Sequence, residues 1–146
     1  MGDFSKEVNS TFPSEEIKAM LNIRYTAHFL SSIGEQILKP HEISNAQYNI
    51  LRILRGAKEP ITMKIVKERM IEKSPNATRL ADKLCDKQLI ERVRCNEDRR
   101  AVYVSITQKG LDLLDVISFE KVTSKINHLT LEEQKLLNNL LDKIRD

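Results

Sequence analysis

The segment from residue 74 to residue 110, SPNATRLADKLCDKQLIERVRCNEDRRAVYVSITQKG, constrains the fold more than any other part of the chain. It opens with Ser74, a good helix cap, and Pro75, which fits the first turn of a helix. The apolar residues that follow have the i, i+3, i+4, i+7 spacing of one helix face. They are Ala77, Leu80, Ala81 and Leu84. The spacing predicts a helix over about 75–87.

Two alternating stretches, ERVRC and AVYVSI, come directly after this helix. Alternation of apolar and polar residues is typical of strands with one buried face. In the second stretch we expect Val102, Val104 and Ile106 to point inward. The two strands then form a hairpin with its tip at about residues 96–100, where acidic residues stand beside two arginines.

Another short helix is predicted just before this segment, over 63–71, with Thr62 as its cap. Met63, Val66 and Met70 fall on one of its faces. The residues IEKS, which end with the next cap Ser74, join it to the following helix, and KEPIT before it allows a very short strand. Two short capped helices followed at once by a basic-tipped hairpin are typical of a winged helix-turn-helix.

The two ends of the chain predict helices that a small single chain cannot cover. One is expected from about 15 to 38, closed by Pro40, and its apolar residues spread over most of its circumference. Thr107 caps a long helix reaching about residue 122, and Thr130 with Glu133 has the pattern of a capping box for the last helix. A helix that is apolar on several sides needs burial on several sides, so a second copy of the chain is a plausible partner.

These patterns predict a mainly α chain with a small β-hairpin wing. Ser44 and Gln47 have the pattern of a further capping box, which opens a helix that ends near Gly56. The winged helix-turn-helix region is expected over 43–109. The helices of residues 1–42 and 110–146 are expected to form a dimerisation region.

Basic residues are concentrated in the middle of the chain. Residues 62–110 carry 12 Lys and Arg against 7 Asp and Glu, whereas the whole chain carries 24 against 21. The ends are therefore slightly acidic. This distribution indicates an anionic partner for the middle of the chain alone.

The helix over 75–87, which we call the reader helix, offers polar side chains opposite its apolar stripe. Asn76 and Thr78 can form hydrogen bonds with base edges or phosphate, and Arg79 can bind guanine or phosphate. Lys83, one turn later, is placed for the phosphate backbone. The alternative is an ordinary solvated helix face, because two aspartates on the same face dilute its charge.

The hairpin tip carries Arg99 and Arg100 beyond the strand residues that serve the core. A guanidinium projected in this way fits the narrow minor groove of DNA, where the negative potential is strongest. Asp98 can pair with Arg100 and fix its direction. The alternative is a solvated turn with an incidental ion pair, which would contribute little.

Other classes of protein find little support in the sequence. The three histidines are far apart, no metal-binding, phosphate-binding or nucleophile motif is present, and we expect neither an enzyme nor a cofactor nor a metal site. No apolar run is long enough to cross a membrane and no secretory signal precedes the helices, so a cytoplasmic protein with reduced cysteines is expected.

The two stretches SPNATRLADKLCDKQLIER and DRRAVYVSITQKG together resemble the MarR (multiple antibiotic resistance regulator) family of dimeric transcription factors. The resemblance covers about residues 43–112 in motif and the whole chain in helix order. It implies a homodimer that binds a pseudo-palindromic duplex, with the reader helix in the major groove and Arg100, oriented by Asp98, in the minor groove. It also implies loss of affinity when a small ligand or an oxidant arrives.

The resemblance and the residue chemistry together define the predicted sites. The DNA-binding residues are expected to be Thr62, Lys64, Ser74, Asn76, Thr78, Arg79, Lys83, Asp98, Arg99 and Arg100. Arg99 would contact the phosphate backbone. By position alone, the family's usual ligand pocket would be lined by Tyr25, His28 and Tyr48, for which ordinary packing is the alternative.

The chain departs from the family at one site that bears on the fold. Gln88 stands where the family usually has glycine, at a position that favours left-handed backbone.

Two alternative functions also remain open for the chain. One is a helical protein-interaction module without specific DNA binding. The other is a thiol redox sensor through Cys95 or Cys85, although Cys85 falls beside the buried stripe of the reader helix.

Overall fold

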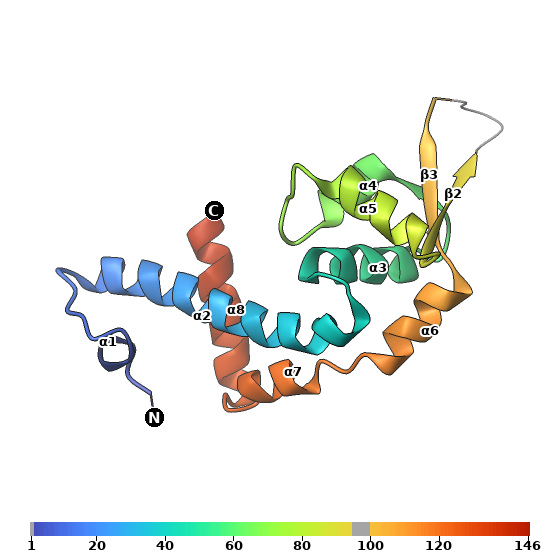
Figure 1. Ribbon diagram of the computed structural model, residues 1–146. Helices are drawn as coiled ribbons and strands as arrows, with labels where there is room; N and C mark the ends of the chain where they lie inside the picture. The colour runs from blue at the N-terminus through green and yellow to red at the C-terminus, as the bar shows by residue number, and fades with distance from the viewer. Residues whose placement is uncertain (1, 95–99) are drawn as a thin grey trace. The chain divides into compact units, whose positions relative to one another are not determined.

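A computed structural model describes residues 2–94 and 100–146 of the chain (Figure 1). The chain divides into two compact parts. The core unit is Glu35–Lys121, and the helical unit combines Met1–Gly34 with Val122–Asp146. Asp98, Arg99 and Cys95, three residues of the predicted sites, lie outside the described residues.

The core unit holds the winged helix-turn-helix. After the end of α2 (Glu15–Leu38), its elements in chain order are η1 (Lys39–His41), α3 (Asn45–Ala57), β1 (Ile61–Thr62), α4 (Met63–Arg69), α5 (Ala77–Asp86), β2 (Ile90–Arg94), β3 (Val102–Ile106) and α6 (Gln108–Val116). The predicted class, mainly α with a small hairpin wing, is confirmed. The reader helix is α5, and the wing is the hairpin of β2 and β3, which extends from the helices of this unit in Figure 1.

The sheet is antiparallel throughout and has the order β1-β3-β2. Val104 at the centre of β3 lies opposite Arg92 of β2 and Ile61 of β1. The short strand that KEPIT allowed is therefore real, although it has only two residues. Strand β1 directly precedes α4 and pairs with β3, so it connects the start of α4 to the wing.

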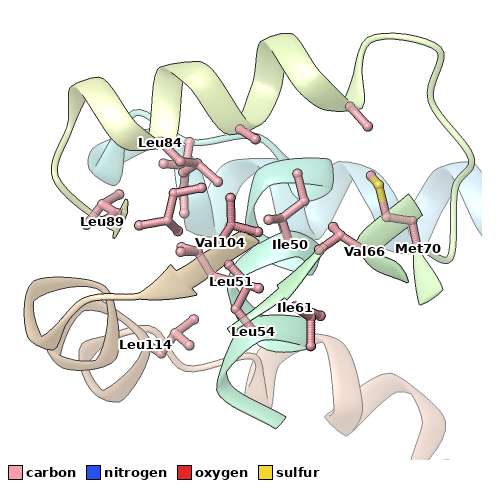
Figure 2. Packing of buried hydrophobic residues seen from close by; sticks show 14 of the residues in the cluster. Ile50, Leu51, Leu54, Ile61, Val66, Met70, Leu84, Leu89, Val104 and Leu114 are labelled. Atoms are coloured by element: carbon pink, nitrogen blue, oxygen red, sulfur yellow. The ribbon is translucent and has the colours of Figure 1, made fainter. Parts of the chain in front are cut away.

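One cluster of buried side chains holds the core unit together (Figure 2). Helix α3 supplies its centre through Ile50, Leu51 and Leu54, which are at most 2% exposed. Leu84 of the reader helix and Val104 of the wing pack against them. Each side chain buried in this way stabilises the fold by about 1.5–3 kcal/mol.

The helix caps predicted at Ser44, Thr62, Thr107 and Thr130 are present, whereas the cap predicted at Ser74 is wrong. The Ser44 hydroxyl accepts from the Gln47 backbone N–H at 3.1 Å while the Gln47 side chain accepts from Ser44 N–H at 3.0 Å. Thr62 accepts from Ile65 N–H, and Thr130 and Glu133 form the reciprocal pair at the start of α8 (Leu131–Arg145). These bonds satisfy backbone donors that a helix start would otherwise leave open.

The reader helix begins later than predicted. The Ser74 hydroxyl accepts from Asn76 N–H at 3.2 Å, two residues on, and residues 75–76 form a turn. Such a local side-chain turn competes with helix capping, so the helix starts at Ala77. The preceding helix, α4, also ends early, at Arg69 rather than at residue 71.

The prediction of one long helix from Thr107 to about residue 122 is wrong. The structure has two helices there, α6 and α7 (Glu120–Ile126), separated by a short extended stretch. Ile117 there has extended backbone and belongs to the buried cluster, and the Ser118 hydroxyl accepts from Glu120 N–H at 3.3 Å. Burial of Ile117 together with this serine turn ends one helix and starts the next.

Val102 is a third departure from the predictions. It was expected to point inward with Val104 and Ile106, but it is 49% exposed while Val104 is 1% exposed. Val102 pairs with Arg94 at the outer end of the sheet. The inward face of the strand continues there beyond the helices that cover Val104.

Gln88 has the left-handed backbone expected of its position, with φ of 61°. Gln88 N–H donates to the Cys85 carbonyl at 2.9 Å, and Leu89 N–H donates to the Leu84 carbonyl at 3.0 Å. These two bonds form a Schellman motif, which normally has glycine at this position. The geometry the family achieves with glycine is therefore reached here with a side chain in place.

The helical unit consists of α1 (Phe4–Glu7), most of α2, most of α7 and α8. Phe4 stacks on Phe12 with ring centres 5.1 Å apart and lies 5.4 Å from the Tyr25 ring. None of the described residues of α1, α7 or α8 is buried. Within residues 2–94 and 100–146, no helix is long and apolar enough to span a bilayer.

Candidate nucleic-acid interface

The reader helix presents a sharp division between a buried and an exposed face. Ala77, Ala81 and Leu84 are at most 3% exposed and pack into the cluster of the core unit. The opposite face is solvent-exposed and carries four of the predicted DNA-binding residues. They are Asn76, Thr78, Arg79 and Lys83. Packing of one face thus leaves a polar, basic face available to a partner.

The other predicted residues of the helix-turn-helix are placed differently from one another. Lys64 is exposed near the start of α4. Thr62 and Ser74 are half-buried, and their hydroxyls already accept backbone hydrogen bonds from Ile65 and Asn76. The Thr62 hydroxyl therefore caps α4, and the Ser74 hydroxyl stabilises the turn before the reader helix.

Basic residues stand at both ends of the described part of the wing. Arg100 is exposed where the described chain resumes before β3. Arg94, the last residue of β2, is also exposed and was not among the predicted site residues. The alternation in ERVRC, which places Arg92 and Arg94 on one face of the strand, was the signal that could have identified it.

An ion pair links the wing to the reader helix. The Arg92 guanidinium donates to the Asp82 carboxylate, and the two side chains are about half exposed. Arg92 lies two residues beyond buried Ile90 on the same strand face, so it is turned toward the helix. Because the pair joins residues of separate elements, no local sequence pattern predicts it.

Cys85 lies between the buried and the exposed side of the reader helix. Burial raises the pKa of its thiol, the positive charge of Arg92 lowers it, and the carboxylates of Asp82 and Asp86 raise it further. A thiol with a raised pKa holds less of the reactive thiolate at neutral pH. The structure therefore disfavours a redox role for Cys85.

Four further hydrogen bonds fix the reader helix from neighbouring elements. The buried Gln47 side chain donates to the Leu80 carbonyl at 3.4 Å. At the far end, Lys109 Nζ donates to the Lys87 carbonyl at 2.9 Å and Thr107 Oγ1 to the Gln88 carbonyl at 2.7 Å. Lys87 Nζ itself donates to the Glu42 carbonyl at 2.7 Å. The donor and acceptor of each bond are 19 or more residues apart, so no local sequence pattern predicts these bonds.

The three predicted ligand-lining residues fall in different parts of the chain. Tyr48 is half-buried in the core unit and stacks on Phe119, with ring centres 4.4 Å apart. Arg52 donates to the Tyr48 hydroxyl at 3.3 Å, and its guanidinium lies 5.9 Å from the ring centre. Tyr25 and His28 are exposed and belong to the helical unit.

Tyr48 and Phe119 line a cavity of about 450 Å³ within the core unit. The complete lining is Asn45, Ala46, Tyr48, Asn49, Arg52, Ile71, Glu72 and Phe119. Asn49 also accepts from Ile71 N–H at 2.9 Å, in the turn that precedes the reader helix. Among the described residues, no group of three His, Cys, Asp or Glu side chains could hold a metal ion.

Comparison with known proteins identifies the class of this fold and surface. A family model described as transcriptional regulator SarA/Rot matches residues 32–117. The HTH-type transcriptional regulator YkoM of Bacillus subtilis (strain 168) is 28% identical over 142 residues, covering 91% of this chain and 90% of YkoM.

Two solved structures show the same architecture. The MarR transcription factor from Planctomyces limnophilus is 32% identical, with a TM-score of 0.69, over 90% of this chain and 98% of that one. The MepR–DNA complex of S. aureus is 22% identical, with a TM-score of 0.78, over 86% of this chain and 94% of MepR. The protein is therefore a transcriptional regulator of the MarR type with a winged-helix fold. Within that class it belongs to the SarA/Rot family of transcriptional regulators.

Proposed function

We propose that the chain acts in the cytoplasm as a homodimer that binds a pseudo-palindromic stretch of double-stranded DNA. Residues 43–109 form the DNA-binding region, and residues 1–42 and 110–146 form the dimerisation region. The observation that carries the proposal is the divided reader helix, which is fixed on its apolar face and exposed on its polar, basic one.

The reader helix has the chemistry to enter the major groove. Asn76 and Thr78 supply short hydrogen-bonding groups near its start, and Arg79 supplies a bidentate donor suited to guanine or phosphate. Lys83, one turn later, and Lys64 of α4 are placed to contact the backbone. The fold is shared with MepR, which was solved in complex with DNA, and this likeness supports DNA binding.

The wing would bind the adjacent minor groove. We assign Arg100 to the groove, oriented by Asp98, and Arg99 to the phosphate backbone. Exposure of Arg100 beside the strand of the wing supports this assignment. Negative potential in a narrow minor groove favours a guanidinium over other side chains.

The helical unit supports dimerisation because many of its large apolar residues are exposed. Helix α8 has no buried residue, and most of its large apolar side chains are 39–66% exposed. They are Leu131, Leu136, Leu137, Leu140 and Ile144. Between α2 and α8 lies a largely apolar groove of about 620 Å³. A second copy of the chain would cover these surfaces and place two reader helices about one DNA turn, ~34–36 Å, apart.

A small effector would bind the cavity beside Tyr48. The stacked Tyr48 and Phe119 rings offer apolar walls, while Arg52 and Asn49 supply polar groups. Because Asn49 also holds the turn before the reader helix, an occupant there could shift that turn. Tyr25 and His28 are exposed in the helical unit and do not line this cavity, so their role in ligand binding stays a prediction.

The first experiment is a fluorescence-anisotropy titration at several salt concentrations. The purified protein is titrated against the duplex upstream of its own coding sequence and against a scrambled duplex of equal length. We expect preferential binding, and the logarithm of affinity should fall with the logarithm of salt by about 0.9 per phosphate neutralised.

Equal, weak binding to both duplexes would contradict sequence-specific recognition and favour a protein-interaction module. Sedimentation of the same sample measures the dimer. A single monomeric species at micromolar concentration would contradict the proposed assembly.

A further inference from the structure

The carboxylate of Asp82 lies on the face of the reader helix proposed to meet DNA. Asp82 follows Thr78 by one helical turn and stands next to Lys83 in sequence. Its side chain is 48% exposed. A carboxylate in this place opposes the binding of phosphates unless another group compensates its charge, because like charges brought together across an interface are unfavourable.

Arg92 is the group that compensates it. The guanidinium reaches from β2 of the wing to the Asp82 carboxylate, although its own side chain is 53% exposed. Two further carboxylates are close in sequence, Asp86 on the helix and Glu91 on the strand, and neither forms a salt bridge with another described residue. Arg92 is thus bonded to the carboxylate nearest the residues proposed to read bases.

Stability alone does not account for this pair. An exposed ion pair contributes little to folding, because water competes for both charges. The reader helix and β2 are already joined by apolar burial, through Leu84, Leu89 and Ile90, each at most 5% exposed. The main effect of the pair is therefore on the charge of the exposed face of the reader helix.

We propose that Arg92 is a positioning residue for DNA binding, which neutralises Asp82 and holds its carboxylate toward the wing and away from the phosphate backbone. This inference rests on the proposed function. Arg92 acts through Asp82 and need not contact DNA. The pair also ties the orientation of the wing to that of the reader helix.

The test is a double-mutant cycle read by DNA affinity and by its salt dependence. The variants are Arg92→Gln, Asp82→Asn, the two combined, and the conservative Arg92→Lys. Arg145→Gln is the matched control, because Arg145 forms a similar exposed ion pair with Asp142 in α8 of the helical unit. Thermal melting of each variant establishes that it is folded before binding is measured.

We expect Arg92→Gln to weaken DNA binding by about fivefold. Adding Asp82→Asn should restore affinity to within about twofold of the original, because no unpaired carboxylate is left to repel phosphate. Arg92→Lys keeps a cation beside Asp82 and should bind nearly as well as the unaltered protein. The salt dependence of the unaltered protein and of the combined variant should be the same.

Two results would overturn the proposal. If the combined variant binds as weakly as Arg92→Gln and the salt slope falls by about 0.9, Arg92 contacts a phosphate directly. If Arg92→Gln binds as well as the Arg145→Gln control, the pair has no role in binding. Absence of any binding by the unaltered protein would instead overturn the proposed function, and with it this role for Arg92.

Discussion

Helices α3 and α8 show how differently the two units of this molecule are held. Both begin with a reciprocal capping box and both carry a stripe of leucine and isoleucine. In α3 the stripe is buried to 2% exposure or less, whereas no residue of α8 is buried. Equal local signals thus lead to a completed core in one unit and to an uncovered apolar face in the other.

The contrast teaches that the two units draw their stability from different sources. The core unit closes a cluster from its own helices and strands, so its fold depends on one chain. The helical unit leaves large apolar side chains in water, which is unfavourable for a single chain. Its stability should therefore depend on protein concentration, while that of the core unit should not.

The largest expected effect is on the core unit. Leu51 is fully buried at the centre of the cluster, so Leu51→Ala removes apolar contacts and leaves a cavity. We expect the free energy of unfolding to fall by about 2–5 kcal/mol in urea denaturation followed by circular dichroism. Leu140→Ala in α8, where the side chain is 51% exposed, is the matched control at low protein concentration. Equal losses for the two variants would remove the distinction between the units.

A change in the helical unit should break assembly instead of folding. Leu137 lines the groove between α2 and α8, and Leu137→Glu would place an unpaired charge in the proposed dimer interface. We expect the dimer dissociation constant to rise about a hundredfold, roughly 3 kcal/mol, in sedimentation velocity. Lys135→Gln, on the same helix but outside the groove lining, should leave the dimer intact. If the Leu137→Glu variant still forms a dimer, the dimer interface lies on another surface.

The wing offers a change that should affect neither folding nor assembly. Arg100→Ala removes an exposed guanidinium from the core unit. We expect DNA affinity to fall by about 1–3 kcal/mol in anisotropy titrations, with the same melting temperature and the same dimer. Unchanged affinity would exclude this arginine from the interface, and a lost dimer would show that the two units are not separable in this way.

The smallest effect is a gain in stability. Gln88 adopts left-handed backbone in the Schellman motif after the reader helix, where glycine has no steric penalty. We expect Gln88→Gly to raise the free energy of unfolding by about 0.5–1 kcal/mol, measured by urea denaturation. Asp86→Gly, two residues earlier within the helix, should lower it by a similar amount. A loss with Gln88→Gly would mean that its side chain makes a favourable contact.

Local signals predicted most of the fold. Capping residues such as Ser44, Thr62 and Thr130 act over three residues, so the sequence alone locates them. The break at Ile117 was missed because it depends on burial against elements far away in the chain. The exposure of Val102 was missed because alternation identifies a face of a strand but not where the covering helices end.

The candidate site divides in the same way. The polar face of the reader helix followed from periodicity, which gives the direction of each side chain. The bond from Gln47 to the Leu80 carbonyl and the pair of Arg92 with Asp82 join elements that only the tertiary fold brings together. Residues 95–99, which include most of the predicted hairpin tip, lie outside the described residues, so the roles of Asp98 and Arg99 stay predictions.

Gly110, in the first turn of α6, has a mechanical consequence. A Cβ atom there would meet the Leu89 carbonyl oxygen at 2.3 Å, so the backbone of α6 lies directly against the turn that follows the reader helix. The Thr107 and Lys109 bonds to the carbonyls of Gln88 and Lys87 close the same junction. Because these contacts hold the start of α6 to the residues directly after the reader helix, we expect a displacement of α6 to move the end of that helix with it.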